Sequence, residues 1–136
     1  MTDEPLGDSP LTPERFGQLA LVAQLPVFAY LGGLVFDDLA FGAVVGLLIG
    51  GGTMLHLPEL LRWAAAGDDG VRPPGGADTR RAAAGLAVDG AGIVAFAARF
   101  AVDGAALAVV AGVVAGLGAY VALQYVLSSS DASTGG

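Results

Sequence analysis

The chain carries FGQLALVAQLPVFAYLGGLVFDDLAFGAVVGLLIGGGTMLHL at residues 16–57, an apolar run broken near its middle by the acidic pair Asp37-Asp38. A second apolar run, from about Ala82 to Leu127, is broken in the same way at Asp103-Gly104. A membrane-spanning helix needs about 20 predominantly apolar residues, so each run is long enough for two crossings. The sequence therefore predicts an all-α integral membrane protein, with four transmembrane helices arranged as two hairpins that form a small bundle.

The composition supports a membrane protein. Of the 136 residues, 54% are hydrophobic and 14% are charged, whereas an ordinary soluble domain has about a quarter of its residues charged. Lipid can cover this much continuous apolar surface, and a single soluble core of this length cannot. Cysteine is absent from the sequence, which excludes disulfides, thiolate metal ligands and cysteine nucleophiles.

The charged residues are strongly biased. The formal net charge is −7, lysine is absent and all six basic residues are arginine. An acidic, lysine-free chain rich in alanine, glycine and valine is typical of a halophilic archaeon, and a GC-rich genome is the alternative explanation. The negative balance also argues against a nucleic acid partner, whose phosphates would be repelled.

Polar segments divide the chain into five parts. We expect a polar N-terminal tail over residues 1–14 and a first transmembrane hairpin over residues 15–63, whose last segment, Pro58–Trp63, forms a short interfacial helix. A flexible cytoplasmic connector (64–81), a second transmembrane hairpin (82–127) and a disordered C-terminal tail (128–136) follow. The four expected membrane helices cover residues 16–36, 39–57, 82–102 and 105–127.

The arginines predict the orientation. Five of them fall at the ends of the hairpins that carry the chain termini and the connector, and only Arg99 falls at the opposite end. Basic residues in short loops favour the cytoplasmic side. We therefore expect a multi-pass protein of the plasma membrane with both termini in the cytoplasm.

A shift of 66 residues aligns the two halves. It lays VFDDLAFGAVVGLLIG (35–50) over AVDGAALAVVAGVVAG (101–116) and matches Asp37 with Asp103. Both halves would then have the same orientation, which makes this a parallel repeat of the kind found in some transporters. The alternative is chance agreement between two hairpins rich in alanine, glycine and valine.

Small residues recur on one face of the second and fourth expected helices. They are Gly42, Gly46 and Gly50 in the first hairpin, and Ala108, Gly112 and Gly116 in the second. Helices in lipid associate through close backbone packing at small residues. We expect these faces to be contact seams, within the four-helix unit or between protomers; a pore lining is the alternative.

Asp89 is the main candidate for function. It lies about two turns beyond Arg81, on the order of 10 Å inside the boundary of its helix. Gln24, Thr53 and Tyr120 reach a similar depth, so we predict a polar layer of these four side chains. Carboxylates inside a membrane often mark ion pathways, which suggests a proton- or cation-binding site. A hydrogen-bonded structural clamp is the alternative.

The remaining polar residues suggest no further site. His56 is the only histidine, and we expect an interfacial side chain and not a metal ligand, since one neighbouring carboxylate makes no metal site. Arg99 and Asp103, four residues apart, are expected to form an ion pair. We predict no cofactor and no enzymatic activity, because one histidine supports no catalytic triad and the glycines at 50–52 lack the lysine of a phosphate loop.

These observations predict a structural or accessory membrane component without a catalytic motif, embedded in the lipid bilayer. Its expected partners are further copies of itself in a homo-oligomer or a larger membrane complex. The alternative is a small oligomeric carrier or channel for an ion or small solute, in which Asp89 binds the coupling cation.

Overall fold

The computed structural model describes residues 11–65 and 77–133, and in those ranges it contains helices and turns but no strand. The helices are α1 (Pro13–Phe36), α2 (Leu39–Ala65), α3 (Ala77–Ala98) and α4 (Ala105–Ser133). All four are long and apolar enough to cross a membrane. The all-α fold with four membrane-spanning helices is thus confirmed.

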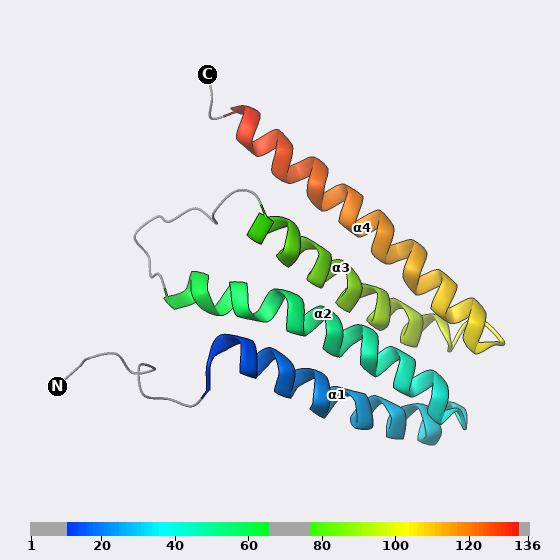
Figure 1. Ribbon diagram of the computed structural model, residues 1–136. Helices are drawn as coiled ribbons and strands as arrows, with labels where there is room; N and C mark the ends of the chain where they lie inside the picture. The colour runs from blue at the N-terminus through cyan, green and yellow to red at the C-terminus, as the bar shows by residue number, and fades with distance from the viewer. Residues whose placement is uncertain (1–10, 66–76, 134–136) are drawn as a thin grey trace.

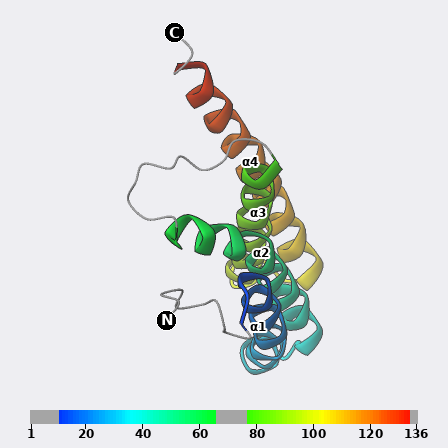
Figure 2. The same ribbon diagram turned by 60° about the vertical axis from the view of Figure 1, so that its left-hand side comes forward.

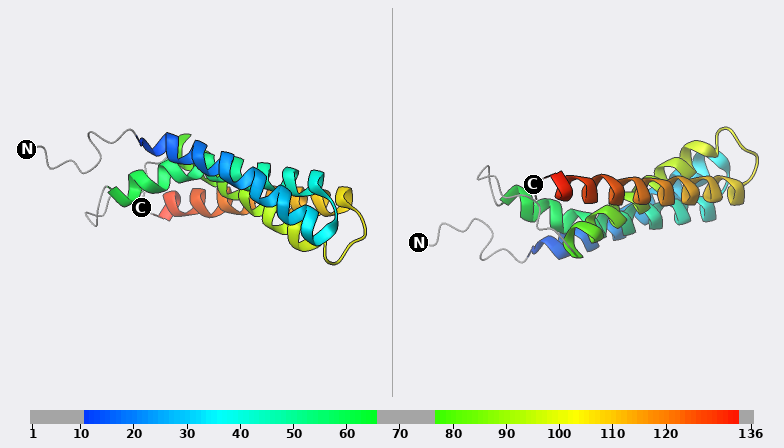
Figure 3. Two further views of the ribbon diagram at one scale, coloured as in Figure 1. Left: turned by 90° about the horizontal axis from the view of Figure 1, so that it is seen from below. Right: turned by 90° about the horizontal axis from the view of Figure 1, so that it is seen from above.

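The helices lie side by side in chain order, as a single layer (Figure 1). α1 packs on α2, α2 on α3 and α3 on α4. The layer is narrow when it is turned (Figure 2), and the helices overlap when it is seen from below or above (Figure 3). The bundle is therefore an open one, with α1 and α4 as its two edges.

The two inner helices of the layer are more buried than the two edge helices. In the most apolar stretch of each helix, 44% of the residues of α2 and 39% of those of α3 are buried, against 6% for α1 and 17% for α4. The start of α1 and the end of α4 lie at the same end of the layer, and the hairpin turns lie at the other (Figure 1). We call these the terminal end and the turn end.

The acidic pair Asp37-Asp38 ends one helix and begins the next. Asp37 adopts a left-handed conformation, with φ 55°, and its backbone N–H donates to the Gly33 carbonyl at 3.1 Å. Asp38 then caps α2, since its Oδ1 accepts a hydrogen bond from the Phe41 N–H at 2.8 Å. The two carboxylates thus make a tight turn through ordinary capping chemistry.

α2 is longer than expected. It continues through Pro58 to Ala65, where a separate interfacial helix over Pro58–Trp63 was expected. Proline inside a helix removes one backbone hydrogen bond and bends the helix. The last turns of α2 do leave the layer at an angle (Figure 2), so the segment that was expected at the interface is the bent end of one continuous helix.

The other boundaries also shift. α3 begins at Ala77 and ends at Ala98, because the residues that follow form turns leading to Gly104, whose φ of 139° few other residues adopt. α4 runs through Ser133, which corrects the expectation of a disordered tail from residue 128. The Ser128 and Ser129 hydroxyls donate to the Tyr125 carbonyl at 2.9 and 2.8 Å, which satisfies these polar side chains within the helix. Residues 1–10, 66–76 and 134–136 of the predicted tails and connector lie outside the described residues.

The two hairpins share one packing register. A Cβ on Gly46 would lie 2.9 Å from the Leu25 Cα, and one on Gly112 would overlap the carbonyl of Ala91, the equivalent of Leu25 under the 66-residue shift. Gly50 likewise meets Leu21, and Gly116 meets Ala87, the equivalent of Leu21. This agreement in three dimensions supports a true repeat over chance similarity of composition.

The turn end holds an aromatic cluster. Phe36 of α1 contacts the rings of Phe41, Phe96 and Phe100 edge to face, with centroids 4.8–5.7 Å apart. These contacts join the two hairpins beside their turns, where Phe41 is part of the buried core.

The contacts of the Arg99 side chain differ from those that the sequence predicted. Its guanidinium lies 5.4 Å from the centre of the Phe36 ring, and its Nη1 donates to the Val102 carbonyl at 3.1 Å. No ion pair with Asp103 forms among the described residues, which corrects the predicted pairing. The reason is that α3 ends at Ala98, so the two residues are not one helical turn apart.

Candidate functional site

Asp89 lies where α2 and α3 approach most closely. A Cβ on Gly52 of α2 would lie 2.8 Å from the Asp89 Cα and 2.5 Å from the Gly85 carbonyl oxygen. A Cβ on Gly85 of α3 would lie 2.7 Å from the His56 backbone nitrogen. The two backbones are therefore in contact, and only glycine fits at these two positions without a shift of the helices.

His56 is turned into this seam. Only 8% of the residue is exposed, whereas the sequence suggested an interfacial side chain. Its Nδ1 lies 2.8 Å from the Gly52 carbonyl oxygen, and since a carbonyl only accepts, Nδ1 carries a proton. The other ring nitrogen, Nε2, then faces Asp89, with 3.9 Å between Nε2 and Oδ2. The single histidine, which is buried, and the predicted intramembrane aspartate, which is partly exposed, thus form a pair.

Sequence reasoning missed this pair, although a signal existed. Gly52 precedes His56 by four residues, and Gly85 precedes Asp89 by four. In each helix a glycine and an ionisable residue therefore share one face. Two such faces on neighbouring antiparallel helices bring both polar side chains to one close crossing.

Thr53 and Gln24 extend the pair towards α1. The Thr53 hydroxyl donates to the Ile49 carbonyl at 2.8 Å and accepts a longer hydrogen bond, 3.5 Å, from Nε2 of Gln24. Thr53 also lies near the Asp89 carboxyl group. The buried Oε1 of Gln24 has no hydrogen-bond partner within the described residues. Three of the four residues of the predicted polar layer thus come together, and His56 joins them.

Tyr120 lies elsewhere. It lines an apolar groove of about 280 Å³ between α3 and α4, which has Ala84, Ala87 and Ala91 on one side and Leu117 beside Tyr120 on the other. Within the part of the chain that the structure describes, Tyr120 forms no hydrogen bond with Asp89.

The predicted small-residue faces all lie inside the chain. Gly42 contacts the Phe28 backbone of α1, next to the Gly46 and Gly50 contacts already described, and Ala108 is fully buried. The structure therefore uses these faces to hold each hairpin together, and they line no pore in the described layer.

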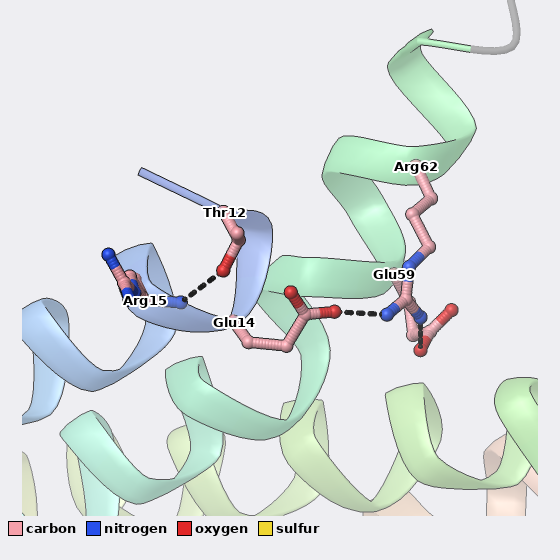
Figure 4. Close-up of polar contacts among 5 residues, drawn as sticks. All are labelled: Thr12, Glu14, Arg15, Glu59 and Arg62. Carbon is pink, nitrogen blue, oxygen red and sulfur yellow. Dashed lines mark hydrogen bonds and ion pairs between the residues drawn. The ribbon is translucent and has the colours of Figure 1, made fainter. Parts of the chain in front are cut away.

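An ionic cluster lies at the terminal end. Arg62 near the end of α2 pairs with Glu14 at the start of α1 and, at 2.5 Å, with Glu59 on its own helix (Figure 4). Glu59 is only 2% exposed, while the Arg62 and Glu14 side chains are half exposed. The cluster fastens the bent end of α2 to the beginning of α1.

The chemistry open to the His56–Asp89 pair is limited. Among residues 11–65 and 77–133, no three histidine, cysteine or acidic side chains converge as metal ligands would. At 3.9 Å the imidazole and the carboxylate are too far apart to share a proton in one hydrogen bond, but either group can bind a proton, and a protonated imidazole would attract the carboxylate. The arrangement suits a structural clamp or a proton-binding group.

Comparison of the chain with protein-family models, with curated proteins and with solved structures finds no match.

Proposed function

We propose that this protein is a structural or accessory membrane component that acts by assembling laterally in the bilayer. The observation that carries the proposal is the open layer. α1 packs mainly on α2 and also touches α3 through the Phe28 and Phe36 rings near the turn end, and α4 packs mainly on α3. Both edge helices leave large apolar side chains exposed elsewhere, among them Val22 and Tyr30 on α1 and Val114 and Val121 on α4. Lipid, further copies of the chain or a larger membrane complex would cover these faces.

The single layer also bears on transport. Four helices in a single layer enclose no pore, so the described part of one chain could form one side of a channel but not a complete channel. Any conduit would have to form between several chains or between this chain and a partner. Assembly is therefore the first property to establish.

The proposed orientation places both termini in the cytoplasm of a plasma membrane. It rests on the arginines and on the common end at which α1 begins and α4 finishes (Figure 1). Because the sequence has no cysteine, single cysteines introduced at Asp38 or Asp103 report the side of each turn. Both should react with an impermeant reagent added outside intact cells, and reaction from the cytoplasmic side alone would reverse the topology.

A carrier or channel is the second candidate. It is favoured by one observation, the His56–Asp89 pair with Thr53 and Gln24 beside it. In that case the pair would bind a proton or cation, and Asp89→Asn would abolish transport by protein reconstituted in vesicles while leaving its assembly unchanged.

The test of lateral assembly is purification of the tagged chain from native membranes in a mild detergent. High salt should be used, because we take the acidic, lysine-free composition to reflect a halophilic archaeon. A particle heavier than one chain, made of several copies or including a stoichiometric partner, is the expected result. A monodisperse single chain would contradict the proposal.

A further inference from the structure

The outer face of α4 carries a stripe of small residues. Ala111, Ala115, Gly118 and Ala122 are spaced so that they share one side of the helix. Gly118 is exposed, and a Cβ built on it would meet nothing within 4 Å. No contact within the described chain therefore requires a glycine there.

The repeat supplies a reason for this stripe. Under the 66-residue shift, Gly118 is the equivalent of Gly52, Ala115 of Ile49, and Ala122 of His56. On α2 these three residues form the seam against α3: Gly52 meets Asp89, Ile49 meets Gly92, and His56 meets Gly85. The stripe on α4 is thus the second occurrence of an interface that the chain already forms once.

The opposite side of that interface also recurs. The equivalents of Gly85, Asp89 and Gly92 of α3 are Leu19, Ala23 and Pro26 of α1. All three are exposed, with Leu19 at 53%. α1 and α4 are the two edges of the layer (Figure 1), so the unused halves of the repeated seam lie on opposite edges of it.

The sizes of the paired residues are complementary. In the internal seam, the large Ile49 and His56 of α2 meet Gly92 and Gly85 of α3. In the second seam, the small Ala115 and Ala122 of α4 would meet the large Pro26 and Leu19 of α1. The small residue changes sides, so each pair still combines one large and one small residue, as close helix packing requires.

We propose that α4 of one chain packs against α1 of a second copy, in the register in which α2 packs against α3. This rests on the proposed lateral assembly and names its partner and its surface. Gly118 lies on Ala23 of the next chain, at the point equivalent to Gly52 on Asp89. α4 and α1 run in opposite directions, as α2 and α3 do, so both copies keep one orientation in the membrane.

The interface is head-to-tail, because it joins two different faces of the same chain. Such contacts close into a ring when the rotation between copies allows it, and otherwise extend as a filament. The intermolecular seam is apolar, since Ala122 and Ala23 replace His56 and Asp89. The continuity with the internal seam favours a second copy over lipid as the occupant of this stripe.

Cysteine cross-linking in native membranes tests the proposal, because the natural chain has no cysteine. One chain carries Ala23→Cys and a tagged second chain carries Gly118→Cys, and the two are co-expressed and oxidised. We expect a disulfide-linked dimer that contains one chain of each kind, since the equivalent backbones in the internal seam are within disulfide range. A chain with both substitutions should give a ladder or a closed ring of linked copies.

Matched controls define the geometry. Each single variant expressed alone should stay unlinked, because the proposed interface never places a residue opposite itself. Leu117→Cys, one residue from Gly118 but on a different face of α4, should not link to Ala23→Cys. Strong self-linking of Gly118→Cys would show a symmetric α4–α4 contact and overturn the proposal.

A steric variant provides a second measurement. Gly118→Trp fills space that is open within the chain, so it should keep the thermal stability of the monomer and lower the mass of the purified particle to one chain. An unchanged particle mass, or a mass accounted for by a different stoichiometric protein with no linked pair, would reject the α4–α1 interface. The second of these results would leave the proposed lateral assembly standing.

Discussion

The two hairpins pack in the same register but differ beside their turns. In the first hairpin a two-residue turn, Asp37-Asp38, joins the helices, and a Cβ on Gly32 would lie 2.5 Å from the Gly42 Cα. In the second hairpin the turn spans residues 99–104, and alanines occupy the equivalent positions 98 and 108. Ala108 is fully buried there.

The difference shows how turn length and residue size depend on each other. A two-residue turn holds the helix ends so close that the first facing positions must lack side chains. A longer turn lets the helices separate by the width of a methyl group, and alanine then fills the space. Farther from the turns, both hairpins have glycine at the contact positions: Gly46 and Gly50 in the first, and Gly112 and Gly116 in the second.

The largest loss of stability should follow from replacing Gly42 of the first hairpin by alanine, the residue at the equivalent position 108 of the second. In Gly42→Ala the new methyl group would overlap the Phe28 carbonyl oxygen and lie 2.9 Å from the Gly32 Cα. Both neighbours are backbone atoms that cannot rotate away, so we expect a loss of about 3 kcal/mol in the free energy of unfolding. Unfolding of the purified protein in mixed detergent micelles measures it.

The reverse substitution, Ala108→Gly, loses helix propensity and one buried methyl group, and should cost about 2 kcal/mol. Gly51→Ala is the control, because a Cβ at Gly51 meets nothing within 4 Å. Gly51→Ala should be neutral or slightly stabilising, because alanine has the higher helix propensity. A similar gain for Gly42→Ala would mean that helix propensity, and not helix separation, decides these positions.

The seam between the hairpins should give the next effect. His56 and Asp89 face each other there, whereas Ala122 and Ala23 stand at the equivalent positions of the unused seam. In a double-mutant cycle of His56→Gln and Asp89→Asn, we expect a coupling energy of about 1 kcal/mol. Gln24→Leu, which removes an unpartnered buried oxygen, should show no coupling to His56→Gln. Additive effects of the first two substitutions would show that the pair contributes nothing to joining the hairpins.

Much of the fold was predictable because lipid constrains it. Length and apolarity alone identify four helices, and Asp37-Asp38 could be recognised as a turn. The glycines at every fourth residue predicted close packing, although their spacing left open whether the partner was the same chain or another. The order of the helices in an open layer could not be predicted, because the sequence places apolar residues on every side of all four helices.

The candidate site was only partly predictable for a related reason. Depth along a helix placed Gln24, Thr53 and Asp89 together, but depth says nothing about rotation about the helix axis. Tyr120 has a similar depth and lies at the groove between α3 and α4. His56 was assigned to the interface because Pro58 suggested the end of the helix, and α2 in fact continues past it. The error in the predicted end of this helix therefore placed His56 at the membrane surface, whereas its side chain is buried between α2 and α3.

The two turns should also differ in how they use their aspartates. Asp38 accepts a hydrogen bond from the Phe41 N–H at the start of α2, whereas no capping bond of Asp103 is present among the described residues. Asp38→Ala should therefore cost about 1 kcal/mol, and Asp103→Ala should stay within about 0.5 kcal/mol of the natural chain. Asp38→Asn, which keeps the accepting oxygen, should recover most of the loss. A cost for Asp103→Ala as large as that for Asp38→Ala would contradict this difference.

The smallest effect is expected at the terminal end, where the residues of the ionic cluster are not repeated in the second hairpin. Glu14, Glu59 and Arg62 form an ionic cluster in the first hairpin, and the equivalent positions of the second are Arg80, Tyr125 and Ser128. Because the Glu14 and Arg62 side chains are half exposed, water and salt weaken their attraction.

We expect Glu14→Gln to lower the thermal midpoint by less than Asp38→Ala does, and the difference to vanish as salt is raised. Arg62→Gln should have the larger effect, because it leaves the buried carboxylate of Glu59 without the partner it has in the structure. A loss of stability for Glu14→Gln as large as that for Gly42→Ala would contradict this expectation. It would mean that the ionic cluster, and not the glycine contacts, is the main interaction between α1 and α2.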